Sequence, residues 1–375
     1  MKKALALLAL LAAACCLLTF SAAAESAVVE SGACGENLTW TLDAVGTLTV
    51  SGTGAMKDFG YKGAPWYQSR DSIQAVVVEN GVTSIGKYAF SGCSSLSSIT
   101  IPASVTTIGD SAFWFCDSLK DVYITDLAAW CRIDFRGTPM SYAKNIWLDG
   151  QKIVSVTMPE GVTEVKAYTF YGFKDLIQVT IPESVTAIGE YAFQGCESLT
   201  SINIPESVTT IGNSAFRFCD SLTGITIPEG VTTIGDSAFW SCESLTSINI
   251  PESVTTIGDS AFRLCDSLTG ITIPEGVTTI GGSAFSYCSS LTSITIPEGV
   301  TSIGGSAFYG CSSLISITLP QGLTAIGDRA FQFCSCLNSI TLPEGVTAIG
   351  KYAFDGCYEI SNLSLPSTLK TIGEE

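Results

Sequence analysis

A pattern with a period of 23 residues runs through most of this chain and restricts it to one kind of architecture. One copy, LTSITIPEGVTSIGGSAFYGC, occupies residues 291–311. Its proline returns at Pro159, Pro182, Pro205, Pro228, Pro251, Pro274, Pro297, Pro320, Pro343 and Pro366, and its phenylalanine at Phe170, Phe193, Phe216, Phe239, Phe262, Phe285, Phe308, Phe331 and Phe354, with Phe90 and Phe113 ahead of an interruption. A fixed period of roughly 20 to 29 residues with Leu and Ile at set places indicates a solenoid of stacked units.

Each unit predicts a strand, a turn, a second extended piece and a helical turn. After Leu291, polar and apolar residues alternate over 293–296, as they do in a half-buried strand. The Ile-Pro-Glu-Gly at 296–299 has the composition of a turn, and 300–303 forms the second extended piece. Ser-Ala-Phe at 306–308 then begins the helical turn. A single unit is too small to bury its apolar side chains, so we expect the units to share one continuous core.

The pattern L-x-x-I-x-I-P-x-x-V-T-x-I-G-x-x-A-F-x-x-C resembles the BspA-type leucine-rich repeats of bacterial and some protist surface proteins. The resemblance covers about four fifths of the chain, with spacing and residue types matching together. It implies a leucine-rich repeat solenoid of the α/β class, with short parallel strands and helical turns on the convex side. It also implies secretion and roles in adhesion or host-protein binding, and no catalytic site.

The segment before the repeats lacks the period. Residues 38–42 and 47–50 alternate around an Ala-Val-Gly connection, which predicts a β-hairpin in a small β-rich N-terminal cap. Further on, Asp126 is placed to cap a short helix, and Asp149-Gly150 predicts a second hairpin within an insertion. The insertion is either a tolerated irregularity or a protruding recognition loop. The last unit stops at Glu375, which leaves either an open strand edge or the end of a fragment. The expected organisation is a signal peptide (1–24), a capping segment (25–80), first repeats (81–120), an irregular repeat with the insertion (121–158) and regular repeats (159–375).

Charge and hydropathy predict an exported protein. Lys2 and Lys3 precede an apolar run and Ala22-Ala23-Ala24, the pattern of a secretory signal cleaved before Glu25. Removing this segment leaves 16 basic residues, from 18 less two, against 35 acidic ones, a net charge of −19. Such a surface repels nucleic acid. No later stretch is apolar over about 18 residues, so we expect no membrane span.

Glutamate recurs at the turn of the unit and is interpreted as a solvated turn residue. Repeated like charges repel one another, and calcium binding by their carboxylates is the alternative. The positions are Glu183, Glu206, Glu229, Glu252, Glu275, Glu298 and Glu344.

Cysteine recurs in the same way. Ten of the thirteen cysteines left after cleavage, from Cys93 to Cys357, occupy one position in the unit. Side chains stacked in register point in the same direction, so reduced, buried thiols are favoured over disulfides. The chain has no histidine and no C-x-x-C pair, so we expect no metal site and no cofactor.

The sequence also predicts that the protein is not an enzyme. Without histidine the Ser-His and Cys-His nucleophile systems are excluded. Gly-Asp-Ser at Gly109, Gly235 and Gly258 is similar to an esterase motif but recurs as a segment of the repeat with no base available.

Variation is concentrated inside the frame A-F-x-x-C. Residues 196–241 and 242–287 differ at only five of 46 positions, and three of the five fall in this pair. Aromatic residues and Arg carry binding hot spots, although packing between neighbouring turns would also explain them. We therefore expect a secreted or cell-surface solenoid that binds an extracellular protein or glycan, with a passive structural spacer as the alternative. The candidate binding residues are Trp114, Phe115, Arg217, Phe218, Trp240, Arg263, Tyr287, Tyr309 and Phe333.

Overall fold

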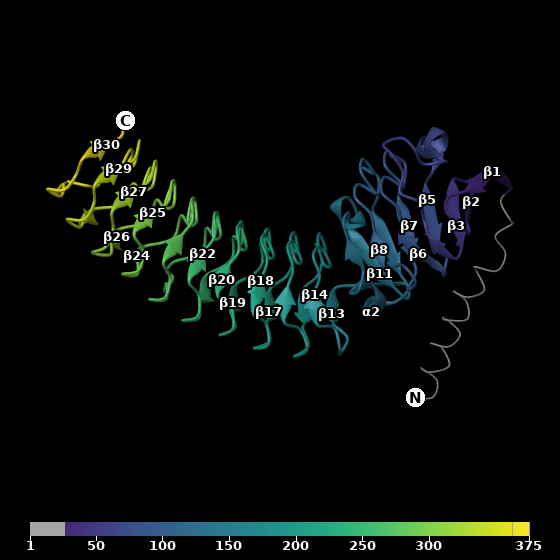
Figure 1. The fold of residues 1–375 in the computed structure, drawn as a ribbon, viewed down its shortest axis with the longest axis horizontal. Coiled ribbons are helices and arrows are strands. Elements are labelled where there is room, and N and C mark those ends of the chain that lie inside the picture. Colours follow the sequence, from purple (N-terminus) through teal and green to yellow (C-terminus); the bar gives the residue numbers. More distant parts are fainter. Residues whose placement is uncertain (1–26, 362, 375) are drawn as a thin grey trace, which may run out of the picture.

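The computed structural model describes residues 27–361 and 363–374, so the expected signal peptide lies outside the described residues. The chain forms a solenoid whose coils stack side by side along a curved axis, from β1–β3 at one end to β30 at the other (Figure 1). Most coils contribute two short strands, and equivalent strands of successive coils pair in parallel. Within the described residues, no helix has the length and apolar character needed to cross a membrane.

Residues 28–152 contain an eight-stranded sheet and a four-stranded sheet. The larger runs in the order β1 (Val28–Ala33), β2 (Leu38–Asp43), β3 (Thr47–Gly52), β5 (Ala75–Val78), β7 (Ser98–Ile101), β9 (Asp121–Ile124), β11 (Asn145–Leu148) and β12 (Gln151–Lys152). The smaller runs in the order β10 (Asp134–Phe135), β8 (Thr107–Ile108), β6 (Val82–Ile85) and β4 (Gly54–Ala55). The first predicted hairpin is confirmed, because β2 and β3 pair antiparallel with Trp40 opposite Val50.

From residue 155 onward the coils are regular. Their first strands are β13 (Ser155–Thr157), β15 (Gln178–Thr180), β17 (Ser201–Asn203), β19 (Gly224–Thr226), β21 (Ser247–Asn249), β24 (Ser293–Thr295), β26 (Ser316–Thr318) and β28 (Ser339–Ile340). Their second strands are β14 (Glu164–Val165), β16 (Ala187–Ile188), β18 (Thr210–Ile211), β20 (Thr233–Ile234), β22 (Thr256–Ile257), β23 (Thr279–Ile280), β25 (Ser302–Ile303), β27 (Ala325–Ile326), β29 (Ala348–Ile349) and β30 (Thr371–Ile372). The register places Val179 beside Ile202 and Ile188 beside Ile211, so residues one period apart are neighbours.

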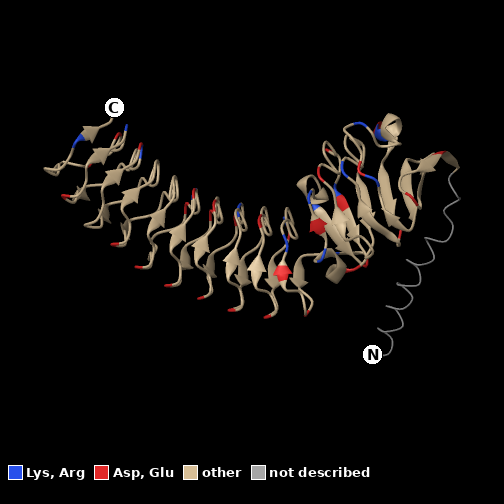
Figure 2. Cartoon of the chain, viewed as in Figure 1, with Lys and Arg blue, Asp and Glu red and all other residues tan. Residues whose placement is uncertain are grey.

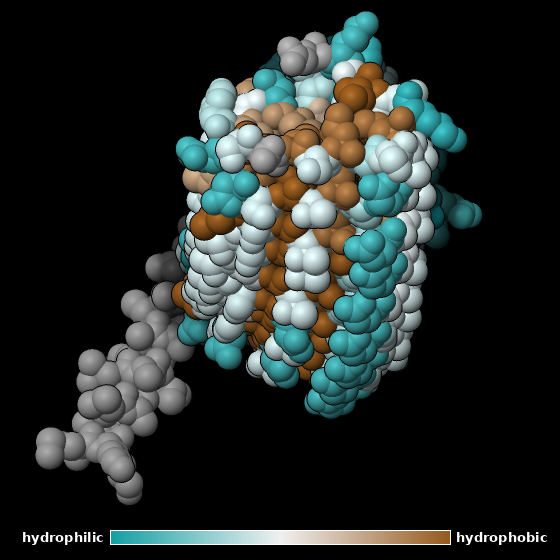
Figure 3. All heavy atoms as spheres, turned by 90° about the vertical axis from the view of Figure 1, so that its left-hand side faces the viewer, coloured by the Kyte–Doolittle hydropathy of each residue, from teal (hydrophilic) through white to brown (hydrophobic). Residues whose placement is uncertain are grey.

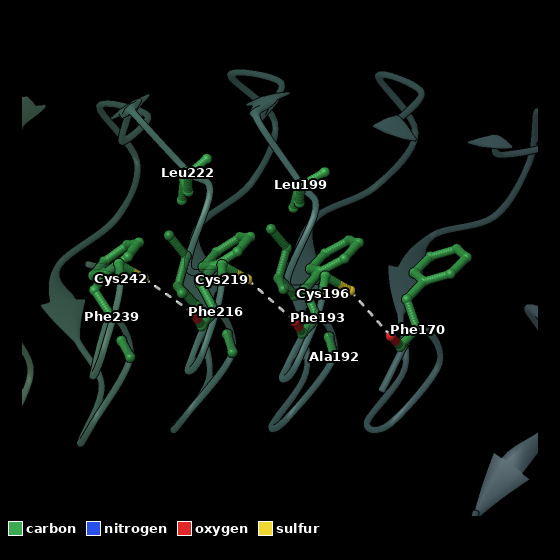
Figure 4. Packing of buried hydrophobic residues seen from close by; sticks show 14 of the residues in the cluster. Phe170, Ala192, Phe193, Cys196, Leu199, Phe216, Cys219, Leu222, Phe239 and Cys242 are labelled. Carbon is green, nitrogen blue, oxygen red and sulfur yellow. Dashed lines mark hydrogen bonds between the residues drawn. The ribbon is translucent and has the colours of Figure 1, made fainter. Parts of the chain in front are cut away.

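The core is one continuous cluster in which equivalent side chains of successive coils form columns. Leu199, Leu222 and Leu245 are fully buried, and Figure 4 shows Leu199 and Leu222 at the same place in adjacent coils. Ring centroids of Phe193 and Phe216 lie 5.3 Å apart with an interplanar angle of 4°. Because one apolar interior runs through all the coils, the predicted stacking of units is confirmed.

The cysteines are confirmed as free thiols within the described residues. Cys196 donates its S–H to the backbone oxygen of Phe170 in the preceding coil, at 3.2 Å (Figure 4). Nine cysteines, each 26 residues after the accepting Phe, make such a bond at 3.0–3.2 Å. The position needs a small apolar side chain with a donor, and a thiol supplies both.

The predicted helical turns are wrong. Helices in the described residues are limited to η1 (Tyr67–Ser72), α2 (Leu127–Trp130) and η2 (Pro139–Ser141). In a regular coil, Arg217 N–H bonds back to Ser214 O at 3.2 Å, whereas Phe216 N–H bonds to Ala238 O of the next coil at 2.8 Å. Ser214 and Phe218 also have positive φ, at 54° and 59°. Every second amide in this segment therefore donates its hydrogen bond to the next coil. The left-handed residues also stop a right-handed helix from forming.

The irregular repeat is part of the solenoid. The Asp126 carboxylate accepts the Ala129 N–H at the start of α2, as predicted. The second predicted hairpin is also confirmed, because β11 pairs antiparallel with β12 through a turn at Asp149 and Gly150. Since β11 also pairs in parallel with β9, the hairpin continues the sheet and ends it. The core crosses this break through Trp130, whose indole N–H donates to Thr169 O at 2.8 Å.

Acidic and basic residues are distributed unevenly along the solenoid. Acidic residues recur along the lower edge of the arc in Figure 2, while basic residues gather toward the N-terminal end. Between residues 175 and 350 there are sixteen acidic residues and three arginines. The Glu298 carboxylate accepts the Gln321 N–H of the next coil at 2.9 Å, and Glu344 accepts that of Ser367 at 2.9 Å. In the part of the chain that the structure describes, no group of three or more His, Cys, Asp or Glu is placed to hold a metal ion.

Candidate binding surface

All nine candidate residues occupy the same place in their coils, which we call the ridge: the two residues between the buried Phe and the buried Cys of each A-F-x-x-C segment. Phe216 and Cys219 are both fully buried, so the backbone between them bulges outward and carries Arg217 and Phe218 toward solvent. The same arrangement recurs in each regular coil. Seen from the C-terminal end, hydrophilic residues form columns along the outside of the molecule with apolar surface between them (Figure 3).

The second ridge residue has a left-handed backbone in every coil. Five coils place glycine there, at Gly92, Gly172, Gly195, Gly310 and Gly356. Six coils place Phe115, Phe218, Ser241, Leu264, Tyr287 and Phe333, with φ of 59–62°. A side chain in this conformation costs about 1–2 kcal/mol, which glycine avoids. Large side chains at a position suited to glycine indicate a requirement other than backbone stability.

We expect the Phe333→Gly variant to be more stable than Phe333→Ala by about 1 kcal/mol, because alanine keeps the left-handed strain that glycine relieves. Thermal or urea unfolding of the two variants measures the difference. The matched control is Thr295 in β24, an exposed position with ordinary strand geometry, where glycine should be the less stable replacement by about 0.5–1 kcal/mol. The same ranking at both positions would contradict the assigned strain.

Arg217, Trp240 and Arg263 form a stack across three successive coils. The Arg217 guanidinium lies 3.9 Å from the Trp240 ring centroid, and that of Arg263 lies 4.8 Å from the same ring. Arg217 also lies 4.6 Å from the Phe218 ring. Among the described residues neither arginine forms an ion pair. The two cations are therefore held by cation–π contacts and keep their charge available to a partner.

Tyr287, Tyr309 and Phe333 form a second group of candidate residues. The Tyr287 and Tyr309 rings meet edge to face with centroids 5.1 Å apart, and Tyr309 meets Phe333 in the same way at 5.4 Å. A Cβ on Gly310 would lie 2.8 Å from Cδ1 of Tyr287, and one on Gly356 would lie 2.5 Å from Cδ1 of Phe333. The Tyr287 and Phe333 rings therefore each lean over the glycine of the following coil, which explains why large and small residues adjoin here.

Trp114 and Phe115 form the third group, together with two tyrosines that the sequence analysis missed. Trp114 stacks on Phe115 at 4.5 Å and lies 5.7 Å from the Tyr61 ring and 6.3 Å from the Tyr88 ring. Tyr61 lies outside the repeats, and no periodic signal places it here. Tyr88 could have been noticed because it occupies a position that is Ser in most coils, such as Ser214. The nine candidates thus form three groups, and the irregular repeat separates the Trp114 group from the other two.

A line of acidic residues borders the ridge immediately after the buried cysteines. It comprises Glu197, Asp220, Glu243 and Asp266. Burial raises the pKa of Asp220 to about 6, with further contributions from Glu243 and Glu197 in the adjacent coils. Lys174 lies 2.5 Å from Glu197 and partly offsets this charge. The ridge therefore presents aromatic rings and guanidinium groups beside a strip of carboxylates.

Comparison with known proteins identifies the family of this repeat. The model of the BspA type leucine-rich repeat region matches residues 64–130, 143–269 and 256–375. The chain belongs to the BspA-type leucine-rich repeat family. Leucine-rich repeats generally bind proteins, and solenoids of this kind are typically not enzymes. No curated protein matches the chain.

Two solved structures show what this BspA-type chain is similar to. A leucine-rich repeat protein from Eubacterium ventriosum is 28% identical, with a TM-score of 0.66, over 92% of this chain and 93% of that one. A leucine-rich cell surface protein from Faecalibacterium prausnitzii is 26% identical, with a TM-score of 0.52, over 92% of this chain and 96% of that one. Both likenesses therefore extend over most of this chain.

Proposed function

We propose that this protein is exported and binds an extracellular protein through the ridge between Arg217 and Phe333, as a cell-surface or secreted adhesin. Export is supported by the signal-like residues 1–24 and by the similarity to a protein described as a cell surface protein. We further propose that residues 25–80 cap the first repeats, since Trp66 stacks on Phe90 at 5.7 Å and extends the aromatic column beyond them.

The unpaired Arg217–Trp240–Arg263 stack is the observation that carries this proposal. In a region with sixteen acidic residues and three arginines, two of the arginines leave the carboxylates and pack against one indole. Trp, Tyr and Arg are the residues that dominate binding energy at protein interfaces. Holding the guanidinium groups in advance lowers the entropy that a partner must overcome on binding.

Arg217→Ala combined with Trp240→Ala should abolish capture of the partner from extracellular matrix extract while the protein stays folded. Truncating a central aromatic or Arg anchor costs about 2 kcal/mol or more, a loss of roughly thirtyfold or greater in affinity for each. The control variant is Thr246→Ala with Asn249→Ala, two exposed residues away from the ridge. Circular dichroism and melting temperature verify the fold.

If the Arg217→Ala, Trp240→Ala double variant still captures the partner, the proposed function is wrong. If neither the wild type nor the control retains any extracellular protein, the passive spacer is the correct description instead.

A further inference from the structure

We propose that the aromatic group at the N-terminal end of the ridge is a separate binding site for an uncharged glycan. We call it the platform and define it as Tyr61, Tyr88, Trp114 and Phe115. Three of its rings are largely exposed: Tyr61 at 54%, Trp114 at 42% and Phe115 at 48%. The tyrosine rings also touch each other, with centroids 6.1 Å apart, so the four rings form one continuous surface.

The platform contributes little to the core. Phe113, next to Trp114, is the residue that fills the aromatic column and is buried. The coil before it carries Ser91 and Gly92 at the ridge, so the fold does not require rings at this place. Phe115 moreover keeps a left-handed backbone, with φ of 59°, where that neighbouring coil uses glycine.

A recess of about 240 Å³ opens beside the platform, where η2 of the irregular repeat meets the ridge. Trp114 forms one wall, and Arg136, Thr138, Ser141 and Tyr142 contribute polar groups. None of the lining residues is Asp or Glu. Hydroxyl groups and a guanidinium beside flat rings suit a sugar, whose C–H face packs on an aromatic ring while its hydroxyls form hydrogen bonds at the edge.

Tyr142 is already oriented for such a ligand. Its hydroxyl oxygen accepts the Phe115 N–H at 3.0 Å. Among the described residues its own O–H donates to no group, so its hydrogen is available to a sugar oxygen. The same bond fixes Phe115 relative to the recess, which couples the platform to the polar wall.

Size and charge favour an uncharged glycan over a protein or an acidic polysaccharide. Three half-exposed rings and the less exposed Tyr88 ring offer roughly 400 Å² of surface at most, about half of what one partner contributes to a standard protein interface. The basic groups nearby are partly offset, since Arg136 lies 3.8 Å from Asp134 and Lys87 lies 3.9 Å from Asp110. The strong net negative charge of the chain repels carboxylated or sulfated glycans.

The test titrates the full chain with cellohexaose, xylohexaose, mannohexaose and chitohexaose, following tryptophan fluorescence and calorimetry. We expect at least one of these neutral oligosaccharides to bind, and the Trp114→Ala and Tyr61→Ala variants to bind it at least tenfold more weakly. Phe333→Ala is the matched control, because Phe333 is as exposed as Trp114, at 42%, and lies on the distant part of the ridge. Its affinity should stay within twofold of wild type.

Three results would overturn the assignment: no binding of any neutral oligosaccharide at millimolar concentration, unchanged binding by Trp114→Ala, or tighter binding of hyaluronan oligosaccharides than of neutral ones. The Arg217→Ala and Trp240→Ala double variant separates this site from the proposed protein site. It should bind the oligosaccharide normally, and Trp114→Ala should still capture the extracellular protein.

Discussion

Replacing Phe216 by alanine lowers the free energy of unfolding by about 3–5 kcal/mol, the usual cost of deleting a fully buried aromatic ring. Phe216 has no exposed surface and lies between Phe193 at 5.3 Å and Phe239 at 5.5 Å. Both neighbours belong to other coils, so the cavity weakens two inter-coil interfaces at once. Urea unfolding followed by circular dichroism measures the loss.

Phe354→Ala is the control for this prediction. Phe354 is only partly buried and contacts Phe331 at 5.4 Å on one side. We expect it to cost clearly less than Phe216→Ala. Equal losses at the two positions would show that the side chain acts within its own coil rather than through the column.

Raising the pH above about 9 should unfold the protein steeply, because folding keeps its thiols protonated. Burial raises the pKa of Cys34 and Cys357 from the ordinary 9.0 to about 11, and that of Cys93, Cys131 and Cys288 to about 12. The remaining buried cysteines are shifted in the same direction and at least as far.

The sign follows from proton binding. Between pH 9 and the folded-state pKa values, the unfolded chain has lost thiol protons that the folded chain retains, so stability is fully present below pH 9 and falls as pH rises. Each thiol contributes about 1.4 kcal/mol per pH unit, and twelve shifted thiols together give a slope on the order of 10 kcal/mol per unit. That exceeds the total stability of most domains within about one pH unit.

Circular dichroism against pH, with thiolate absorbance recorded in parallel, measures this transition. Cys242→Ser removes one titrating group but keeps a donor for Phe216 O, so the slope should decrease by about one thiol's share. Thiolate absorbance that appears while the fold is intact would contradict the expected coupling.

The sequence predicted the stacking well because each consequence of the period is local and repeated. Once residues 23 apart are known to be neighbours, the row of Leu199, Leu222 and Leu245 follows, as do the buried thiols. The short signals at Asp126 and at Asp149-Gly150 were equally reliable, since capping and tight turns depend on a few adjacent residues.

The helical turn was predicted wrongly because a short apolar motif says nothing about where its amides bond. Ser-Ala-Phe is compatible with a helix, and only the neighbouring coil reveals that Ser214 N–H donates to Asp236 O and Phe216 N–H to Ala238 O. A competing acceptor in another coil decides the backbone conformation here, and propensity within one unit does not include it.

The candidate surface was found only in part, for a related reason. Variation at the ridge identified which positions differ, but the contact between Arg217 and Trp240 depends on how side chains lean across coils. The platform could not be assembled from sequence, because Tyr61 comes from a segment without the period and reaches Trp114 only in three dimensions.

The near identity of residues 196–241 and 242–287 allows the length of the solenoid to change by whole coils. Every coil offers the same bonding edge to the next one, so unequal exchange between such copies inserts or deletes whole coils and leaves every remaining register intact. Each event moves Tyr309 and Phe333, which follow the repeated block, closer to or farther from Trp114 by a fixed increment. Descendants of one gene can thereby vary the separation of two recognition points without evolving a new fold.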